Sequence, residues 1–309
     1  MVIKSFAKLN LYLQVLNKRK DNFHNLSTLF ARIDLADKLI FRKRKDSLIK
    51  IKCDGHQVPK GKTNLCYRAA DLLKQELRLK NNGLPSSRQS HKLNSGIEIE
   101  LKKFIPVGAG LGGGSANAAS VLLGLNQFWN LNLSKTRLVS LGAKLGSDVP
   151  FFIYQTRFAL GSQRGDKIKP LASLDRLKLW FILIYPKFKV STPLIYQEFD
   201  THLSGSSSFS QLTRPRCNVK ILTSELLKKG NLVSAGCLYN SLEPITSNLY
   251  PVVNQVKNAL FGIGLDKVMM SGSGPAVFAI CDSYLQAQSL RNKLCKQYKS
   301  WQIFVVSTV

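Results

Sequence analysis

The stretch that most constrains this chain is residues 106–115 (PVGAGLGGGS), which hold five glycines between an expected strand and an expected helix. The preceding residues, 97–102, alternate apolar and charged side chains as a half-buried strand does. The following segment repeats apolar residues at helical spacing, namely Ala118, Val121, Leu122, Leu125 and Trp129. The first N–H groups of a helix have no intrahelical partner, and the helix dipole favours negative charge there. The arrangement therefore predicts a phosphate site, and the expected occupant is a nucleotide polyphosphate.

Two common nucleotide-binding loops do not fit. Gly108-x-Gly110-x-x-Gly113 satisfies GxGxxG, but a dinucleotide site needs an acidic residue about 20 positions later, and residues 101–147 contain no Asp or Glu. A P-loop needs a lysine directly after its glycines, and none follows here. The protein-kinase signatures are also missing. A glycine turn that only packs a helix on a sheet stays an alternative, although so many glycines lose much backbone entropy on folding.

Three motifs resemble those of the GHMP kinases, the family of galactokinase, homoserine kinase, mevalonate kinase and phosphomevalonate kinase. Residues 106–119 resemble the family's phosphate loop, residues 6–11 (FAKLNL) its first motif, and residues 270–276 (MSGSGPA) its third. They occur in the family's order over essentially the whole chain. The resemblance implies ATP as co-substrate. It implies ATP contacts from Pro106, Val107, Gly108, Ala109, Gly110, Leu111, Gly112, Gly113, Gly114, Ser115 and Ala116.

Within the family, three further stretches resemble the members that act on 4-diphosphocytidyl-2-C-methyl-D-erythritol in the non-mevalonate isoprenoid pathway. They are residues 19–26 (RKDNFHNL), 145–152 (LGSDVPFF) and 190–193 (VSTP). The resemblance implies an enzyme that phosphorylates the C2 hydroxyl of this cytidine diphosphate substrate, giving the 2-phosphate and ADP. Two alternatives stay open. One is another GHMP kinase, acting on homoserine, mevalonate or a sugar, and the other is a non-catalytic, basic relative that binds nucleic acid.

Asp148 and Lys8 are the candidate catalytic residues. Phosphorylating an alcohol needs a group that orients the hydroxyl and accepts its proton, and the resemblance assigns this role to Asp148. Without the resemblance, Asp148 would serve equally well as a turn cap before Pro150. Lys8 and Asn10 share the polar face of the strand expected over residues 2–16. A lysine beside a catalytic carboxylate would keep it ionised and offset phosphoryl charge, and Asn10 would hydrogen-bond the substrate.

Phe23, His24 and Tyr196 are the candidate contacts to the cytosine. The chain reads Asn22-Phe23-His24 where the resembled members usually have Gly-Tyr-His. Asn tolerates the left-handed conformation that a glycine would favour, and Phe keeps the aromatic face. The resemblance places Phe23 and Tyr196 on the two faces of the base and His24 at its edge. The alternative is that these side chains belong to the core.

Ser115 is expected to begin the helix, where its hydroxyl would cap the helix or contact the β-phosphate or Mg²⁺. Magnesium is expected with ATP because substrate phosphates supply many of its ligands, and no separate metal motif is evident. The six cysteines lack CxxC spacing, which argues against a zinc site and against a disulfide framework. The prediction is therefore reduced thiols. The cysteines are Cys53, Cys66, Cys217, Cys237, Cys281 and Cys295.

The chain is strongly basic, with 45 Lys and Arg against 18 Asp and Glu and a formal net charge of +27. Such a charge attracts polyanions, but it is spread along the chain and accompanies no nucleic-acid module. A basic surface that steers a phosphorylated substrate is therefore favoured over dedicated nucleic-acid binding. No apolar run approaches the ~20 residues of a membrane span, and no leader precedes the first strand. The expectation is a cytoplasmic monomer or weak homodimer.

The pattern of elements predicts an α+β fold in two domains, 1–160 and 161–309. The resemblance implies an N-terminal domain like one in a small-subunit ribosomal protein, a ferredoxin-like C-terminal domain, and an active site between them. Strands are expected over residues 97–102, 151–154, 179–185, 267–270, 276–281 and 302–307. Helices are expected over 64–77, 134–145, 221–227, 252–260 and 285–298, with a loop over 80–95 and an exposed insertion over 202–216.

Overall fold

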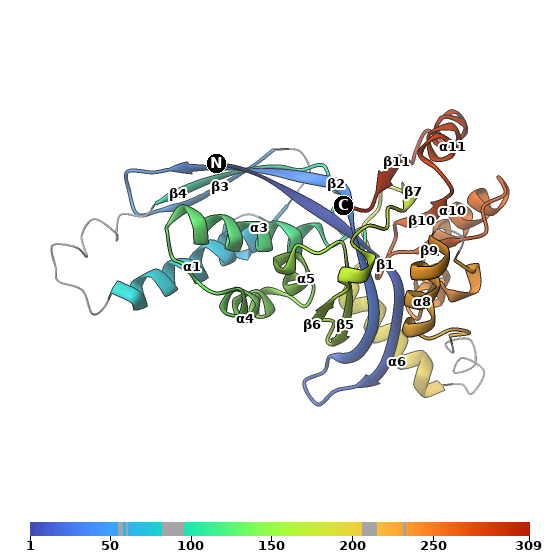
Figure 1. The fold of residues 1–309 in the computed structure, drawn as a ribbon, viewed down its shortest axis with the longest axis horizontal. Helices are drawn as coiled ribbons and strands as arrows, with labels where there is room; N and C mark the ends of the chain where they lie inside the picture. The colour runs from blue at the N-terminus through green and yellow to red at the C-terminus, as the bar shows by residue number, and fades with distance from the viewer. Residues whose placement is uncertain (55–57, 60, 82–95, 206–214, 231–232) are drawn as a thin grey trace. The chain divides into compact units, whose positions relative to one another are not determined.

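The computed structural model describes residues 1–54, 58–59, 61–81, 96–205, 215–230 and 233–309 (Figure 1). The chain forms two compact units, each assembled from separate stretches. Unit 1 comprises Met1–Ala7, Leu35–Val107 and Gly112–Gln155, and unit 2 comprises Lys8–Asp34, Gly108–Leu111 and Thr156–Val309. The glycine loop therefore contributes its first half to unit 2 and its second half to unit 1. The domain boundary near residue 160 stays a prediction.

The sheet of unit 1 is built around β4 (Ile97–Lys102). Strands β1 (Val2–Lys18) and β2 (His24–Lys43) each contribute residues to both units. In unit 1, β4 pairs antiparallel with β2 and parallel with β3 (Ile49–Asp54). Buried Ile and Leu residues alternate along β4 with partly exposed charged residues. This confirms the alternation predicted for the strand that leads into the glycine loop.

Helices α1 (Leu65–Asn81), α3 (Gly113–Phe128) and α4 (Lys135–Leu145) lie on one side of the strands β3 and β4 (Figure 1). Asn64 caps α1, because its side chain accepts a hydrogen bond of 2.8 Å from the Cys66 N–H. Ser134 caps α4 in the same way, and Gly146 follows the end of α4. These helices and caps confirm the sequence predictions.

The strand predicted over residues 151–154 is wrong. Val149–Tyr154 form a short helix, α5, with Pro150 in its first turn. A proline suits that position because the first N–H groups of a helix need no intrahelical partner. A short apolar run has no periodicity that separates a buried strand from one turn of buried helix. The correction matters because α5 directly follows Asp148.

Unit 2 contains two sets of paired strands. In the first, β1 pairs in parallel with β8 (Tyr239–Asn240), and β2 pairs antiparallel with β5 (Phe158–Gln163), which pairs with β6 (Lys167–Pro170). The second is a four-stranded sheet in the order β11-β7-β10-β9 with antiparallel pairs. Its strands are β9 (Val268–Met270), β10 (Val277–Cys281), β7 (Trp180–Tyr185) and β11 (Gln302–Ser307). All four confirm predicted strands.

The helices of unit 2 are α6 (Thr192–Gly205), α8 (Val219–Lys229), α9 (Glu243–Leu249), α10 (Val252–Phe261) and α11 (Tyr284–Gln297). The last two and α8 were expected, whereas α6 and α9 were not. Residues 202–205, expected in an exposed insertion, belong to α6, so that part of the prediction is wrong. Residues 206–214 of the insertion and 82–95 of the predicted loop lie outside the described residues.

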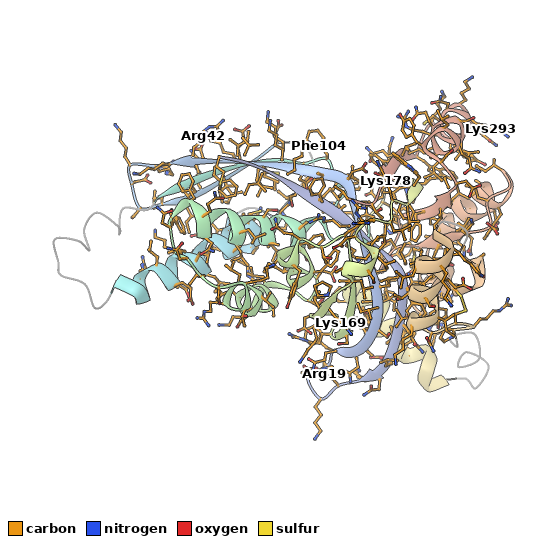
Figure 2. The ribbon with its side chains drawn as sticks, viewed as in Figure 1. Arg19, Arg42, Phe104, Lys169, Lys178 and Lys293 are labelled. Atoms are coloured by element: carbon orange, nitrogen blue, oxygen red, sulfur yellow. A yellow bond between two sulfur atoms is a disulfide. The ribbon has the colours of Figure 1, made fainter. Side chains whose placement is uncertain are left out.

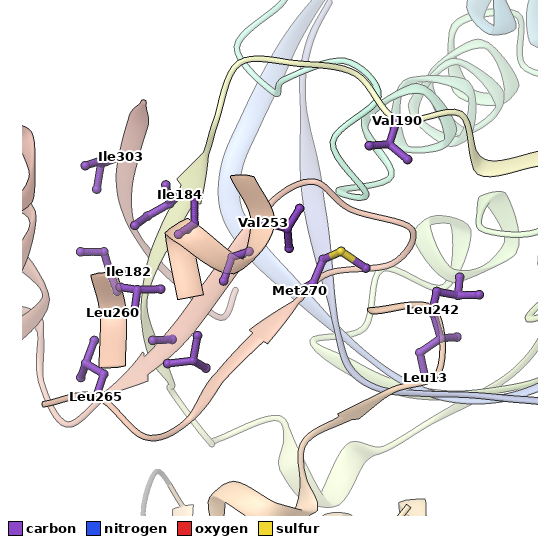
Figure 3. Packing of buried hydrophobic residues seen from close by; sticks show 14 of the residues in the cluster. Leu13, Ile182, Ile184, Val190, Leu242, Val253, Leu260, Leu265, Met270 and Ile303 are labelled. Carbon is purple, nitrogen blue, oxygen red and sulfur yellow. The ribbon is translucent and has the colours of Figure 1, made fainter. Parts of the chain in front are cut away.

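Buried apolar side chains from β1, β7, β9, β10 and several helices form one core in unit 2 (Figure 3). Ile182 and Ile184 project from β7, where five consecutive residues are buried, as in a strand covered on both faces. Val253 and Leu260 of α10 and Met270 of β9 pack in the same cluster. The core therefore anchors the strand that ends at the C-terminal glycine turn, residues 271–276.

Two of the predicted thiols are bonded to each other. Cys217 and Cys237 form a disulfide between the residue preceding the α8 cap and the 3₁₀ turn Ala235–Cys237, so the prediction is wrong for this pair. The pair is 20 positions apart, a spacing that close-cysteine motifs do not contain. The other four cysteines are free, as predicted. Burial raises the pKa of Cys66 to about 12, so its thiol stays protonated at neutral pH.

Candidate active site

The first half of the glycine loop, Gly108–Leu111, runs along the C-terminal glycine turn within unit 2. The Ala276 N–H donates to the Ala109 carbonyl at 3.3 Å, and Ser271 Oγ donates to the Gly110 carbonyl at 3.1 Å. Gly110 has φ +77°, and a Cβ on it would overlap the carbonyl oxygen of Ser271. Only glycine satisfies both conditions, so the second and third motifs meet through a contact that excludes a side chain.

Lys8 and Asn10 lie beside the same turn. Lys8 Nζ donates to Asn10 Oδ1, and Asn10 Nδ2 donates to Thr28 Oγ1 at 2.8 Å. A Cβ on Gly272 would lie 3.3 Å from Lys8 Nζ and 3.4 Å from Asn10 Oδ1. Both side chains are buried, at 4% and 2% exposure, although the strand pattern alone would place them on a polar face. Asn10 therefore holds the Lys8 ammonium group in place beside the backbone of Gly272.

The second half of the loop forms the start of α3 in unit 1. Gly112 occupies the cap position with φ +67°, and the helix begins at Gly113. Ser115 is therefore the third helical residue, and the prediction that it begins or caps the helix is wrong. A Cβ on Gly146 would lie 3.8 Å from Ser115 Oγ, so this hydroxyl faces the turn that leads to Asp148.

Asp148 lies at the start of α5, two residues beyond Gly146. Its backbone is already helical, and its side chain makes no capping hydrogen bond to α5. The Asp148 carboxylate is therefore not the cap of α5, and the alternative of a turn cap before Pro150 stays open. The turn that leads to Asp148 therefore lies beside Ser115, in the first turn of α3.

The turn between β1 and β2 presents Phe23. Asn22 has φ +62°, which confirms that it takes the left-handed conformation expected at the position of the usual glycine. The Phe23 side chain is 53% exposed, and the Arg164 guanidinium lies 5.1 Å from its ring centroid. A large, half-exposed aromatic face is thus available in unit 2.

His24, the first residue of β2, is buried against α6. Its imidazole stacks on the Tyr196 ring with centroids 5.2 Å apart, and Nε2 lies 2.7 Å from Asp200 Oδ1. The structure therefore brings His24 and Tyr196 together, as members of one aromatic cluster that also contains Phe199. Phe23 contacts Arg164 instead.

Asp200 was missed by sequence reasoning. It also accepts a hydrogen bond of 2.7 Å from Lys18 Nζ. Burial raises the pKa of this carboxyl, but the hydrogen bonds from Lys18 and His24 outweigh burial and hold the pKa below its usual value. An ionised acceptor keeps a proton on His24 Nε2 and orients the ring. Asp200 lies on α6, a helix that the sequence analysis did not predict.

A basic pocket of about 420 Å³ lies in unit 1 beside α1 and the end of α4. Lys62, Arg68 and Lys144 line it together with Asp71. Lys144 precedes Gly146 by two residues, so the pocket adjoins the turn next to Ser115. Its residues were missed because lysines and arginines are so frequent here that none stands out. Basic side chains are present in both units, and Figure 2 labels Arg42 in unit 1 and Lys169, Lys178 and Lys293 in unit 2.

No three His, Cys, Asp or Glu side chains cluster as a metal site in the part of the chain that the structure describes. Magnesium held mainly by substrate phosphates needs only one or two protein oxygens, and the Ser115 hydroxyl fits that requirement. Among the same residues, no helix has the length and apolar character needed to cross a membrane. The cytoplasmic location and the oligomeric state stay predictions.

Comparison with known proteins assigns the family. The model of the GHMP kinases N terminal domain matches residues 64–156, and that of the GHMP kinases C terminal region matches residues 223–300. The chain belongs to the GHMP kinase family. This GHMP kinase therefore has the two-domain, mixed α and β fold that its motifs predicted, and the family implies ATP as co-substrate.

Close relatives extend over nearly all of this GHMP kinase. The 4-diphosphocytidyl-2-C-methyl-D-erythritol kinase of Syntrophus aciditrophicus is 37% identical over 308 residues, 99% of each chain. The protein of the same name from Enterococcus faecalis is 35% identical and covers 93% of this chain and 92% of its own. A crystal structure of 4-(cytidine 5'-diphospho)-2C-methyl-D-erythritol kinase is 31% identical, with a TM-score of 0.77 over both whole chains. Homoserine kinase from Cytophaga hutchinsonii, 21% identical with a TM-score of 0.67 over 100% of this chain and 94% of its own, shares the fold.

Proposed function

We propose that this GHMP kinase transfers the γ-phosphate of ATP to the C2 hydroxyl of 4-diphosphocytidyl-2-C-methyl-D-erythritol, in the non-mevalonate isoprenoid pathway. The observation that carries the proposal is the 37% identity, over 99% of both chains, to a relative named as the kinase for this substrate. The GHMP kinases for homoserine and mevalonate share the fold at 21% identity or less. The sequence at 19–26, 145–152 and 190–193 supports the same choice.

The proposed chemistry is an in-line transfer. The C2 hydroxyl oxygen forms a bond to the γ-phosphorus, the bond from that phosphorus to the β,γ-bridging oxygen breaks, and ADP leaves. Asp148 orients the hydroxyl and accepts its proton. Lys8, whose ammonium is buried and fixed by Asn10, offsets negative charge on the transferring group.

The proposed ATP site is the glycine loop, residues 106–116. No side chain caps the start of α3, so its first N–H groups can donate to a phosphate. The helix dipole favours negative charge at the same place. The cations Lys62, Arg68 and Lys144 of the nearby basic pocket add attraction for a polyanion. Magnesium would be held mainly by the ATP phosphates, with the Ser115 hydroxyl as a protein ligand, and it would supply charge neutralisation at the transferring phosphoryl group.

The proposed cytosine contacts are Phe23, His24 and Tyr196, with Asn10 toward the rest of the substrate. Phe23 offers an exposed ring for stacking. His24 is held by Asp200, so its orientation is set before a base arrives. The Arg164 guanidinium, which lies over the Phe23 ring, is paired with Asp166.

Replacing Phe23 with Ala tests the base platform. Base stacking on an aromatic side chain contributes about 1–3 kcal/mol, so the KM for the cytidine substrate should rise roughly 5- to 150-fold while the KM for ATP stays nearly unchanged. Phe261→Ala is the matched control, because Phe261 is also about half-exposed beside a cation, Lys257, and lies on α10. Equal increases in both KM values for Phe23→Ala would indicate a structural role instead.

A coupled ADP-release assay tests the proposed function as a whole. The purified protein is offered ATP and Mg²⁺ with the cytidine diphosphate substrate, homoserine, mevalonate or galactose in parallel. We expect turnover with the cytidine substrate alone. Faster turnover of one of the other alcohols would assign the chain to another GHMP activity. No turnover of any of the four, together with an RNA mobility shift at physiological salt, would favour the non-catalytic alternative.

A further inference from the structure

A buried ion pair lies beneath the glycine loop in unit 1, outside the groups assigned to catalysis. Asp37 of β2 is completely buried, and its carboxylate accepts a hydrogen bond from Lys103 Nζ, whose side chain is 3% exposed. Replacing a buried ion pair with apolar residues is often neutral or stabilising. A contribution to stability therefore does not explain well why Asp37 and Lys103 form a buried ion pair. The hydrogen bonds of Asp37 indicate a positioning role.

The Asp37 carboxylate ties three segments together. Oδ1 accepts from the backbone N–H groups of Phe104, at 2.7 Å, and Ile105, at 2.8 Å. Oδ2 accepts from Lys103 and from Asn117 Nδ2, the latter at 2.8 Å. Residues 103–105 connect β4 to the glycine loop, and Asn117 lies in the second turn of α3. One carboxylate therefore fixes both the entry to the loop and the helix that follows it.

The same turn supports the first residue of α3. A Cβ on Gly113 would lie 2.9 Å from Lys103 Nζ and 2.9 Å from Ile105 Cγ2. The Gly113 backbone thus packs against the Lys103 side chain, which donates to Asp37, and against the side chain of Ile105, whose backbone N–H donates to Asp37. Gly113 is required here for close packing against this support, which is a different reason from the approach of a phosphate.

We propose that Asp37 is a positioning residue for the ATP phosphates: it holds residues 103–105 and Asn117 so that the N–H groups at the start of α3 point at the ligand. The inference rests on the proposed use of the glycine loop for ATP. Asp37 acts through the backbone of Phe104 and Ile105 and through Asn117. Binding sites of this kind need geometry held within about 0.5 Å, which hydrogen bonds to a buried charged group provide.

Two double variants distinguish the loss of the Asp37 hydrogen bonds to the loop from the effect of leaving a buried charge without its partner. Both D37N/K103M and D37L/K103M remove the two buried charges, so neither leaves one uncompensated. Asn at position 37 keeps an oxygen for the N–H groups of Phe104 and Ile105, whereas Leu does not. Asn126→Leu is the control, because Asn126 makes two hydrogen bonds to the backbone of Leu133 at the other end of α3.

The readouts are the Kd of a non-hydrolysable ATP analogue by calorimetry, the KM values of both substrates, and Tm. For D37L/K103M we expect the analogue Kd and the KM for ATP to rise at least about tenfold, with the KM for the cytidine substrate within about twofold. D37N/K103M should stay within about threefold of wild type. The control should lower Tm without changing the Kd of the analogue.

Equal analogue affinity in wild type and D37L/K103M would overturn the inference, as would a loss in Asn126→Leu that matches the loss in D37L/K103M. If D37L/K103M does not fold, Asn117→Leu removes the hydrogen bond to Asp37 together with the one to Ser5 Oγ. It must then weaken analogue binding more than Asn126→Leu does, or the inference fails. A wild-type protein that does not bind the analogue would instead refute the proposed function, so the two failures are distinct.

Discussion

Asp148→Asn should lower kcat by at least about 100-fold, because the variant keeps the shape of the side chain but loses the group proposed to accept the proton. Changes in KM should be small, since an amide still fits where the carboxylate did. Single-turnover measurements would establish that phosphoryl transfer limits the rate. Some activity should remain, because positioning and charge stabilisation supply much of phosphoryl-transfer catalysis.

Lys8→Met should also lower kcat, and the double variant should be little worse than the worse single variant, because residues that act as a unit are not additive. Asp175→Asn is a suitable control, since Asp175 ends the short 3₁₀ helix Ala172–Leu174 in an exposed position. If folded Asp148→Asn retains most of its kcat, Asp148 is not the base.

Gly110→Ala should raise the KM for ATP at least about tenfold and lower Tm, because two penalties coincide at one residue. The position has φ +77°, and the new methyl group would overlap the carbonyl oxygen of Ser271. Either the glycine loop or the C-terminal glycine turn must move. Both belong to the motifs that we propose surround the phosphates and Lys8.

Gly264→Ala separates the two penalties. Gly264 has φ +88°, so alanine there carries the backbone strain, but nothing lies within 4 Å of the added Cβ. Its cost should be about 1–2 kcal/mol of stability with no change in the KM for ATP. If Gly110→Ala behaves like Gly264→Ala in both respects, the contact with Ser271 has no part in nucleotide binding.

Much of the fold could be predicted from periodicity and caps. The predicted strand over residues 302–307 coincides with β11, and Asn64 and Ser134 cap the helices that they were expected to cap. The three family motifs also predicted the fold class that the family comparison confirms. Local signals suffice in these cases because the side chain that sets the boundary lies next to it in sequence.

The wrong or missing predictions concern features that depend on contacts between residues far apart in the sequence. The run Val149–Tyr154 is too short to show a period, and packing makes it helical. Cys217 and Cys237 meet only after the polypeptide folds back. Asp37 and Asp200 resemble any other aspartates in the sequence, and their roles come from partners such as Lys103, which is 66 positions from Asp37, and His24, which is 176 positions from Asp200. The roles assigned to Lys8, Asp148 and the cytosine contacts stay predictions.

The interleaved construction of unit 2 has a consequence for biosynthesis. Tyr12 of β1 pairs with Tyr239 of β8, and Ile33 forms a β-bridge with Thr308. The N-terminal strands therefore cannot complete their pairing until the C-terminal residues have been synthesised. At about 5–20 residues per second, a ribosome leaves these early strands without their late partners for on the order of ten seconds or more. During that interval, apolar side chains such as Leu9 and Leu11, which are completely buried after folding, are exposed on the nascent chain. Protection by a chaperone at the ribosome is therefore expected to improve the yield of folded enzyme.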